Sequence, residues 1–265
     1  MSIRLALSAA VTGAALLLAP QCGFASMILN EYNGVADGGS TGTADPFWGL
    51  TPGNGGNWFE MVVVGNGAAG TSDVRGYSIE VTDGSGDPAG LVNLSNDPFW
   101  SAVPNGSILT FIEKDTATGG LDTGLFLDDQ RAAAGWSWSN IFLGDATLLA
   151  AGTTATLPIS NSDTQIIVRD SPGGTIVFGP AGEAIADEGV NSSEVLKLEA
   201  DPAPGIDVGP SGPYNDGAST TFGQPNVWDG GASVQSFAAY RVPEPSSLAA
   251  MLAAIAGGVM FARRK

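Results

Sequence analysis

The stretch Gly76-Tyr77-Ser78-Ile79-Glu80-Val81-Thr82 alternates large apolar side chains with small or polar ones. Successive side chains of a β-strand point to opposite faces of a sheet, so this pattern predicts a strand with one buried face. Similar short runs rich in β-branched and aromatic residues recur along the chain, separated by clusters of Gly, Pro, Asn, Asp and Ser. The sequence therefore predicts an all-β domain with many turns.

Eight segments fit this description, and no internal repeat of fixed period connects them, which argues against a solenoid or a propeller. The predicted strands cover residues 27–32, 58–64, 76–82, 107–113, 164–169, 175–178, 194–198 and 234–241. Between the two ends of the chain, a helical turn is expected only near residues 128–134.

The first 25 residues have the pattern of a secretory signal peptide, which places a helix ahead of the β-domain. Arg4 precedes an apolar run, and Gly23-Phe24-Ala25 puts small residues at the positions that a signal peptidase reads. We expect cleavage between Ala25 and Ser26. Lipidation of Cys22 is the less favoured alternative, because the residues before it do not form a lipobox.

The last residues, 242–265, fall into three parts. The first is the tetrapeptide Val242, Pro243, Glu244 and Pro245. An uncharged apolar run follows, and as a helix from 246 to 262 it would be ~25 Å long, at the short end of what spans a bilayer core of ~30 Å. The chain ends on Arg263, Arg264 and Lys265, which would stop the transmembrane helix on the cytoplasmic side. The alternative, a C-terminal core helix, should show a polar face, and none is present.

This three-part tail resembles the PEP-CTERM sorting signal of Gram-negative bacteria. The resemblance implies handling by an exosortase-type membrane protease or transpeptidase that cuts near the Val-Pro-Glu-Pro motif. It also implies passage through the inner membrane to the outer surface or extracellular matrix, in organisms that make exopolysaccharide. Residues 26–241 are then the exported body of the protein.

The composition of this body restricts its chemistry. The chain has no His, and its only Cys lies in the signal peptide, which excludes a Cys nucleophile, a Ser-His-Asp triad, disulfides and the usual Cys/His zinc site. Six basic residues against 26 acidic ones give the body a formal charge of −20. Nucleic acid is therefore not an expected partner, since it is itself a polyanion. A solvated acidic surface or divalent-cation binding fits this charge better.

Four segments of the body resemble a lamin-tail domain. They are Ile28-Leu29-Asn30-Glu31, Trp58-Phe59-Glu60-Met61-Val62, Asp73-Val74-Arg75-Gly76-Tyr77-Ser78-Ile79 and Phe222-Gly223-Gln224-Pro225-Asn226. The resemblance implies an immunoglobulin-like β-sandwich, a fold that does not by itself name an activity. Tyr77 stands where the family usually has Trp, and the chain is longer than a minimal member, with the excess expected in residues 34–57 and 119–151.

Two acidic residues within predicted strands are candidates for chemistry. Glu31 and Glu60 could form a pair of carboxylates for acid–base catalysis or metal binding, with Arg75 as the nearest cation in sequence. The preferred interpretation gives them a structural role as hydrogen-bonding framework groups, because they stand at framework positions of the resemblance.

Two further patterns point to ligands. Asp83, Ser85 and Asp87 place oxygen atoms at alternate positions of a Gly-rich turn, as in a calcium loop, although a hairpin turn without metal explains them equally well. Trp136-Ser137-Trp138 and the two Asp-Pro-Phe-Trp sequences at residues 45–48 and 97–100 could stack on sugar rings, but aromatic residues in a β-sandwich more often form the core.

The sequence thus favours a non-enzymatic surface or matrix protein, structural or ligand-binding, in an exopolysaccharide environment, with no catalytic residues and no required cofactor. One alternative is a secreted hydrolase acting through Glu31, Glu60 and Asp83. The other is a calcium- or carbohydrate-binding module.

Overall fold

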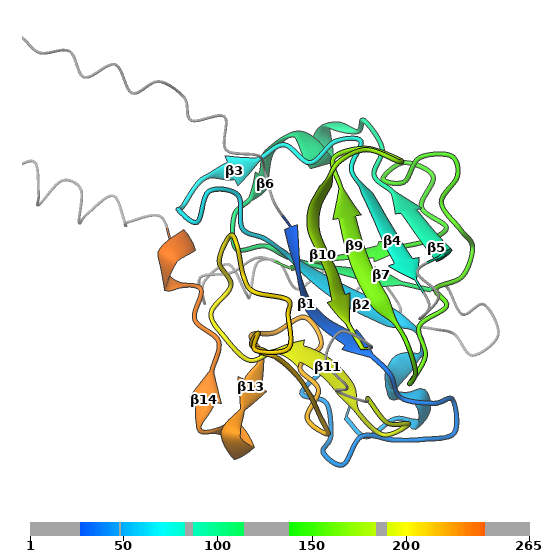
Figure 1. Ribbon diagram of the computed structural model, residues 1–265, viewed down its shortest axis with the longest axis vertical. Coiled ribbons are helices and arrows are strands. Elements are labelled where there is room, and N and C mark those ends of the chain that lie inside the picture. Colours follow the sequence, from blue (N-terminus) through cyan, green and yellow to red (C-terminus); the bar gives the residue numbers. More distant parts are fainter. Residues whose placement is uncertain (1–26, 48, 83–86, 114–137, 184–189, 242–265) are drawn as a thin grey trace, which may run out of the picture.

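The computed structural model describes residues 27–47, 49–82, 87–113, 138–183 and 190–241. Over these ranges the protein is all-β, as predicted (Figure 1). Helical structure among them is limited to short 3-10 turns, namely η1 (Pro52–Gly55), η2 (Pro98–Ala102), η3 (Asp229–Gly231) and η4 (Ala238–Tyr240). None of the helices in the described ranges is long and apolar enough to cross a membrane. The predicted signal helix and transmembrane helix lie outside these ranges.

The larger sheet has six strands. Their order across the sheet is β12 (Tyr214–Gly217), β11 (Val195–Leu198), β1 (Met27–Asn33), β2 (Trp58–Val63), β7 (Ile108–Ile112) and β8 (Trp138–Phe142). Neighbouring strands are antiparallel except for β7 and β8, which run parallel. The first strand of the described chain therefore lies at the centre of the sheet, between an early strand and a late one.

The second sheet has four antiparallel strands. Their order is β10 (Ile176–Gly182), β9 (Gln165–Arg169), β4 (Ser78–Thr82) and β5 (Pro88–Asn93). Two small ribbons complete the fold, one formed by β3 (Thr71–Ser72) and β6 (Val103–Pro104), the other by β13 (Val227–Trp228) and β14 (Ser233–Val234). In Figure 1 the ribbon of β13 and β14 projects from one end of the molecule.

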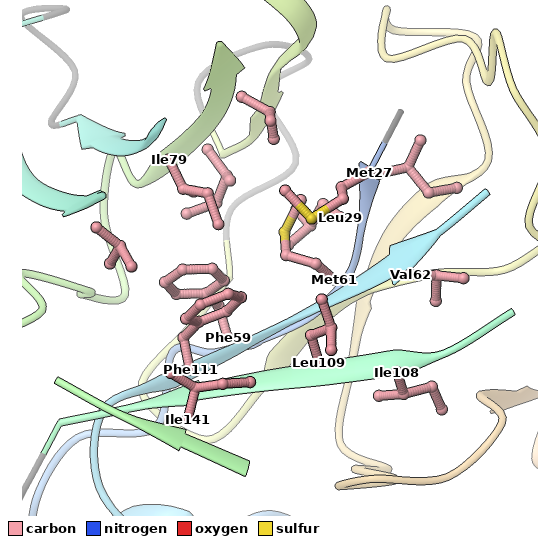
Figure 2. Close-up of a cluster of buried hydrophobic side chains, with 14 of the residues drawn as sticks. Met27, Leu29, Phe59, Met61, Val62, Ile79, Ile108, Leu109, Phe111 and Ile141 are labelled. Carbon is pink, nitrogen blue, oxygen red and sulfur yellow. The ribbon is translucent and has the colours of Figure 1, made fainter. Parts of the chain in front are cut away.

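The core fills the space between the two larger sheets. Ile79 and Val81, the apolar side chains of the alternating strand β4, are both fully buried. Phe59 of β2 and Phe111 of β7 stack with ring centroids 5.0 Å apart, and Figure 2 shows Ile79 of β4 above this pair. The alternation that predicted the strand thus corresponds to packing of the second sheet onto the first.

Seven of the eight predicted strands are confirmed, with ends that shift by a few residues. The eighth prediction, residues 234–241, is wrong: β14 covers only Ser233–Val234, and η4 follows it. The backbone leaves the ladder because side chains accept its N–H groups. The N–H of Ser236 donates to Asp201 at 2.7 Å, and the N–H of Ala238 donates to the Ser236 hydroxyl at 3.3 Å.

Candidate functional site

A β-bulge in the central strand brings polar side chains together. Leu29 pairs with Met61 and Glu31 pairs with Glu60, so Asn30 is an extra residue opposite β2. A bulge of this kind turns two consecutive side chains towards the same partner. Asn30 Nδ2 donates to Glu60 Oε2 at 3.4 Å, and the carboxylates of Glu31 and Glu60 are fully buried.

Three buried carboxylates bind three consecutive backbone N–H groups of the chain after β12. We call Glu31, Asp45 and Glu60 the carboxylate cluster. Glu31 accepts from the N–H of Thr221 at 3.2 Å, and Asp45 accepts from the N–H of Phe222 at 3.1 Å. Glu60 accepts from the N–H of Gly223. The cluster therefore supplies the acceptors that a buried irregular segment needs.

Hydroxyl groups complete the coordination of these carboxylates. The Thr221 hydroxyl donates to Glu31 at 2.8 Å, and the Thr220 hydroxyl donates to Asp45 at 3.1 Å. The Thr110 hydroxyl donates to Glu60 at 3.0 Å and accepts from the indole N–H of Trp138 at 2.7 Å. Each carboxylate is thus bound to donors of the protein itself.

Burial raises the pKa of Glu31 from 4.5 to about 7, with a smaller contribution from the negative charge of Asp45. Hydrogen bonds from Thr221 and Thr220 and the positive charge of Lys197 oppose this rise in pKa. Burial also raises the pKa of Glu60 well above its usual value, and the neighbouring charge of Glu31 adds to it. The pair therefore retains a proton near neutral pH.

Lys197 is the cation of this site, and Arg75, the nearest cation in sequence, is not. Lys197 pairs with Glu31 across β11 and β1, and its side chain is buried. Its Nζ donates to the Ser219 hydroxyl at 2.7 Å and to the backbone oxygen of Val227 at 2.8 Å. Arg75 instead forms an exposed ion pair with Asp73. Strand pairing, which sequence distance does not reveal, decides which cation lies near the carboxylates.

Asn226 connects this network to the central strands. Its Nδ2 donates to the backbone oxygen of Asn30 at 2.9 Å and to that of Leu198 at 3.0 Å. Gln235 Nε2 donates to Asn30 Oδ1 at 2.9 Å, which adds the segment after β14. The chain beyond β12 is therefore attached to the sheet largely through buried polar groups.

A cavity of about 710 Å³ lies next to the carboxylate cluster. Thr220 and Thr221 belong to both, because their hydroxyls bind carboxylates while the residues line the cavity. Apolar walls come from Ala44, Pro46, Pro225, Val227, Val234 and Phe237. Polar lining groups include Ser219, Gln224, Gln235 and Ser236, and Arg241 is the one charged residue of the lining that the structure describes.

The carboxylate pair has the properties of a framework rather than of a reaction centre. Glu31 and Glu60 have no exposed surface, and protein donors bind their oxygen atoms. A general acid or nucleophile must reach its substrate within hydrogen-bonding distance, and the bound Thr221 and Gly223 segments occupy that space.

No family model matches the chain. Neither does any curated protein or solved structure.

The predicted ligand sites have different outcomes. Of the calcium-loop residues, Asp83 and Ser85 lie outside the described ranges, and Asp87 is exposed. No group of three or more acidic side chains that could hold a metal ion occurs in the part of the chain that the structure describes.

The predicted sorting and cleavage residues lie outside the described ranges. They are Ala25, Ser26, Val242, Pro243, Glu244, Pro245, Arg263, Arg264 and Lys265.

The tryptophans proposed for sugar stacking belong to the core where they are described. Trp138 and Trp100 are buried, whereas Trp136 and Trp48 lie outside the described residues. Phe222 packs edge-on against Trp138, with centroids 5.3 Å apart. Trp138 is therefore not available as a platform for a sugar ring.

Asp45 is the member of the carboxylate cluster that the sequence analysis did not identify as a candidate. It begins one of the two Asp-Pro-Phe sequences, and in both the Asp accepts the N–H of the Phe, at 2.6 Å for Asp45 and 2.8 Å for Asp97. The repeated motif thus indicates a shared turn rather than two sugar sites. Asp45 differs from Asp97 in being buried, with a second oxygen that binds the segment after β12.

Proposed function

We propose that the chain is an exported, non-enzymatic protein of the surface or extracellular matrix of a Gram-negative bacterium, with a structural or ligand-binding role. The observation that carries the proposal is the ordered tail of residues 242–265, in which a Val-Pro-Glu-Pro motif precedes an uncharged apolar run and a basic end. The signal-peptide pattern of residues 1–25 supports it from the other end. The partner that this tail implies is an exosortase-type membrane protease.

We further propose that the body is an immunoglobulin-like β-sandwich of the lamin-tail type. Three of the segments that carry this resemblance meet in one network: Asn30 from the first, Glu60 from the second and Asn226 from the last. Residues separated by more than 190 positions thus form a single buried unit.

Two properties of the carboxylate cluster support a non-enzymatic role. Its oxygen atoms bind backbone N–H and hydroxyl groups of Thr221, Gly223 and Thr110. A hydrolase using Glu31 and Glu60 would also need a space for substrate between the two carboxyl groups. The cavity instead borders the threonine side of the cluster, with Thr220 and Thr221 between them.

Localisation of the full chain in a bacterium that has an exosortase-type system tests the proposal. Surface labelling and membrane fractionation should find the native chain at the outer surface. Replacement of Pro243 and Pro245 by Ala should leave it in the inner membrane, whereas the same replacement of Pro202 and Pro210, in the body, should not. Equal surface delivery of both variants would refute the sorting role of the tail.

A further inference from the structure

We propose that the cavity beside Thr220 and Thr221 is a binding site for a short neutral saccharide. This inference rests on the non-enzymatic binding role proposed above and gives it a location and a ligand class. The volume of the cavity, about 710 Å³, lies within the range of roughly 300–1,000 Å³ that is typical of small-molecule sites. The hydrogen bonds, the charge and the apolar walls of the cavity each restrict the ligand.

The polar groups of the lining include both acceptors and donors. The hydroxyl of Thr221 has one proton, and the acceptors within its reach are the buried Glu31 and Asn226, so towards a ligand its oxygen acts as an acceptor. The hydroxyl of Ser219 accepts from the ammonium of Lys197, which leaves its own proton to donate. A ligand hydroxyl can serve both, because it donates and accepts.

Gln224 adds a side-chain amide that can both donate and accept hydrogen bonds. It lines the cavity, and among the described residues its side chain makes no hydrogen bond, so its amide can donate to one ligand oxygen and accept from another. Gln235, by contrast, is committed to the framework through Asn30 and the backbone oxygen of Ala200. The available pattern of amide and hydroxyl groups is the kind that recognises polyhydroxylated ligands.

Charged groups of both signs lie at the cavity, so they favour neither an anion nor a cation. Glu31 and Asp45 lie behind the threonines, and the body carries a formal charge of −20, which disfavours an anion. Lys197 beneath Ser219, and Arg241 in the lining, disfavour a cation. A ligand without charge avoids both penalties.

The apolar walls of the cavity fit the C–H faces of a sugar ring. Pro46, Pro225 and Val234 present aliphatic carbon to the cavity, and Val234 is 58% exposed although it is a large apolar side chain. Sugar rings carry C–H faces between their hydroxyl edges, so such walls can cover the faces while the polar groups bind the edges. Burial of the exposed Val234 surface adds a hydrophobic contribution to binding.

Titration calorimetry tests the proposal with the purified full chain in a detergent that contains no sugar. The probes are a set of neutral trisaccharides (maltotriose, cellotriose, mannotriose and tri-N-acetylchitotriose), with trigalacturonic acid as the charged comparison. We expect one or more neutral probes to bind. Val234→Trp, which fills the cavity, should weaken binding at least about tenfold, and Gln224→Ala should weaken it several-fold.

Ile176→Trp is the matched control, because Ile176 is also an exposed β-branched residue, 44% exposed, but lies on β10 outside the cavity. It should bind as the native chain does. Absence of binding by every neutral probe overturns the inference, as does equal binding by Val234→Trp or tighter binding of the acidic probe. Mass spectrometry of the bound sugar separates the two proposals, since shortened products would overturn the non-enzymatic role and leave the site in place.

Discussion

Raising the pH from 4.5 to 8 should destabilise this fold through the carboxylate cluster. Below pH 4.5 Glu31 is protonated in both the folded and the unfolded chain, so it adds no dependence on pH. Between pH 4.5 and about 7 the unfolded chain loses this proton while the buried site retains it. The unfolded state is therefore favoured progressively across this window, and the effect levels off above pH 7.

The size of the effect follows from the two pKa values of Glu31. One pKa unit corresponds to about 1.4 kcal/mol, so a rise from 4.5 to about 7 lowers the free energy of unfolding by about 3 kcal/mol at pH 8. Glu60, whose pKa is raised in the same direction, adds to this loss. Since domains are typically stable by only about 5–15 kcal/mol, the change should be easy to measure.

Urea unfolding followed by tryptophan fluorescence at half-unit steps of pH is the assay. Glu31→Gln removes the titrating group and should flatten the decline between pH 4.5 and 7. Asp37→Asn, at an exposed position, removes one negative charge without touching the cluster and should keep the decline. If Glu31→Gln and Asp37→Asn show the same slope as the native chain, the pH dependence arises from overall charge and the reasoning about burial fails.

Three further substitutions test the network, each by urea unfolding. Gly223→Ala places a Cβ against the Trp138 indole at φ +63° and should lower the free energy of unfolding by about 2–4 kcal/mol. Gly230→Ala, at φ +66° with no atom within 4 Å, should lower it by only about 1 kcal/mol. Equal losses would show that contact with Trp138 is not what makes the first substitution destabilising. Asn226→Ala leaves the buried backbone oxygens of Asn30 and Leu198 without the donor Nδ2 and should lower the free energy of unfolding by about 3 kcal/mol. A loss below about 1 kcal/mol would show that Asn226 is not the main attachment of the chain beyond β12 to the sheet. Lys197→Met removes the cation that lowers the pKa of Glu31, so the decline in stability should extend above pH 7; an unchanged upper limit would show that the two groups do not interact.

The all-β class and seven of the ten strands in the two larger sheets could be predicted because each depends on local pattern. Ile79 and Val81 alternate with polar residues, and both reach the core as expected. By contrast, β12 has the sequence Tyr-Asn-Asp-Gly, which is typical of a turn, and becomes a strand because it pairs with β11. Strand β8 likewise owes its place to parallel pairing with β7. Edge strands of this kind depend on partners that sequence pattern alone does not identify.

Two residues of the candidate site, but not its geometry, could be singled out from the sequence. Glu31 and Glu60 were weighed as a catalytic pair and, by preference, as structural hydrogen-bonding groups, and they do lie opposite each other. The bulge that adds Asn30 depends on register, and Asp45 reaches Phe222 across 177 positions of sequence. A rule based on neighbours in sequence therefore gave Arg75 as the cation, whereas pairing across β11 supplies Lys197.

The carboxylate cluster and the cavity follow from one structural requirement. A segment that formed a regular strand would satisfy its N–H groups through hydrogen bonds to a neighbouring strand. The segment from Thr220 to Gly223 is irregular, so its buried N–H groups need other acceptors, which Glu31, Asp45 and Glu60 provide. Carboxylates suit this role because each accepts several hydrogen bonds at once. Burial in this role raises the pKa of Glu31 and Glu60. It also fixes Thr220 and Thr221, which form part of the cavity wall. The buried Glu31, Asp45 and Glu60 thus support the backbone that forms one wall of the cavity.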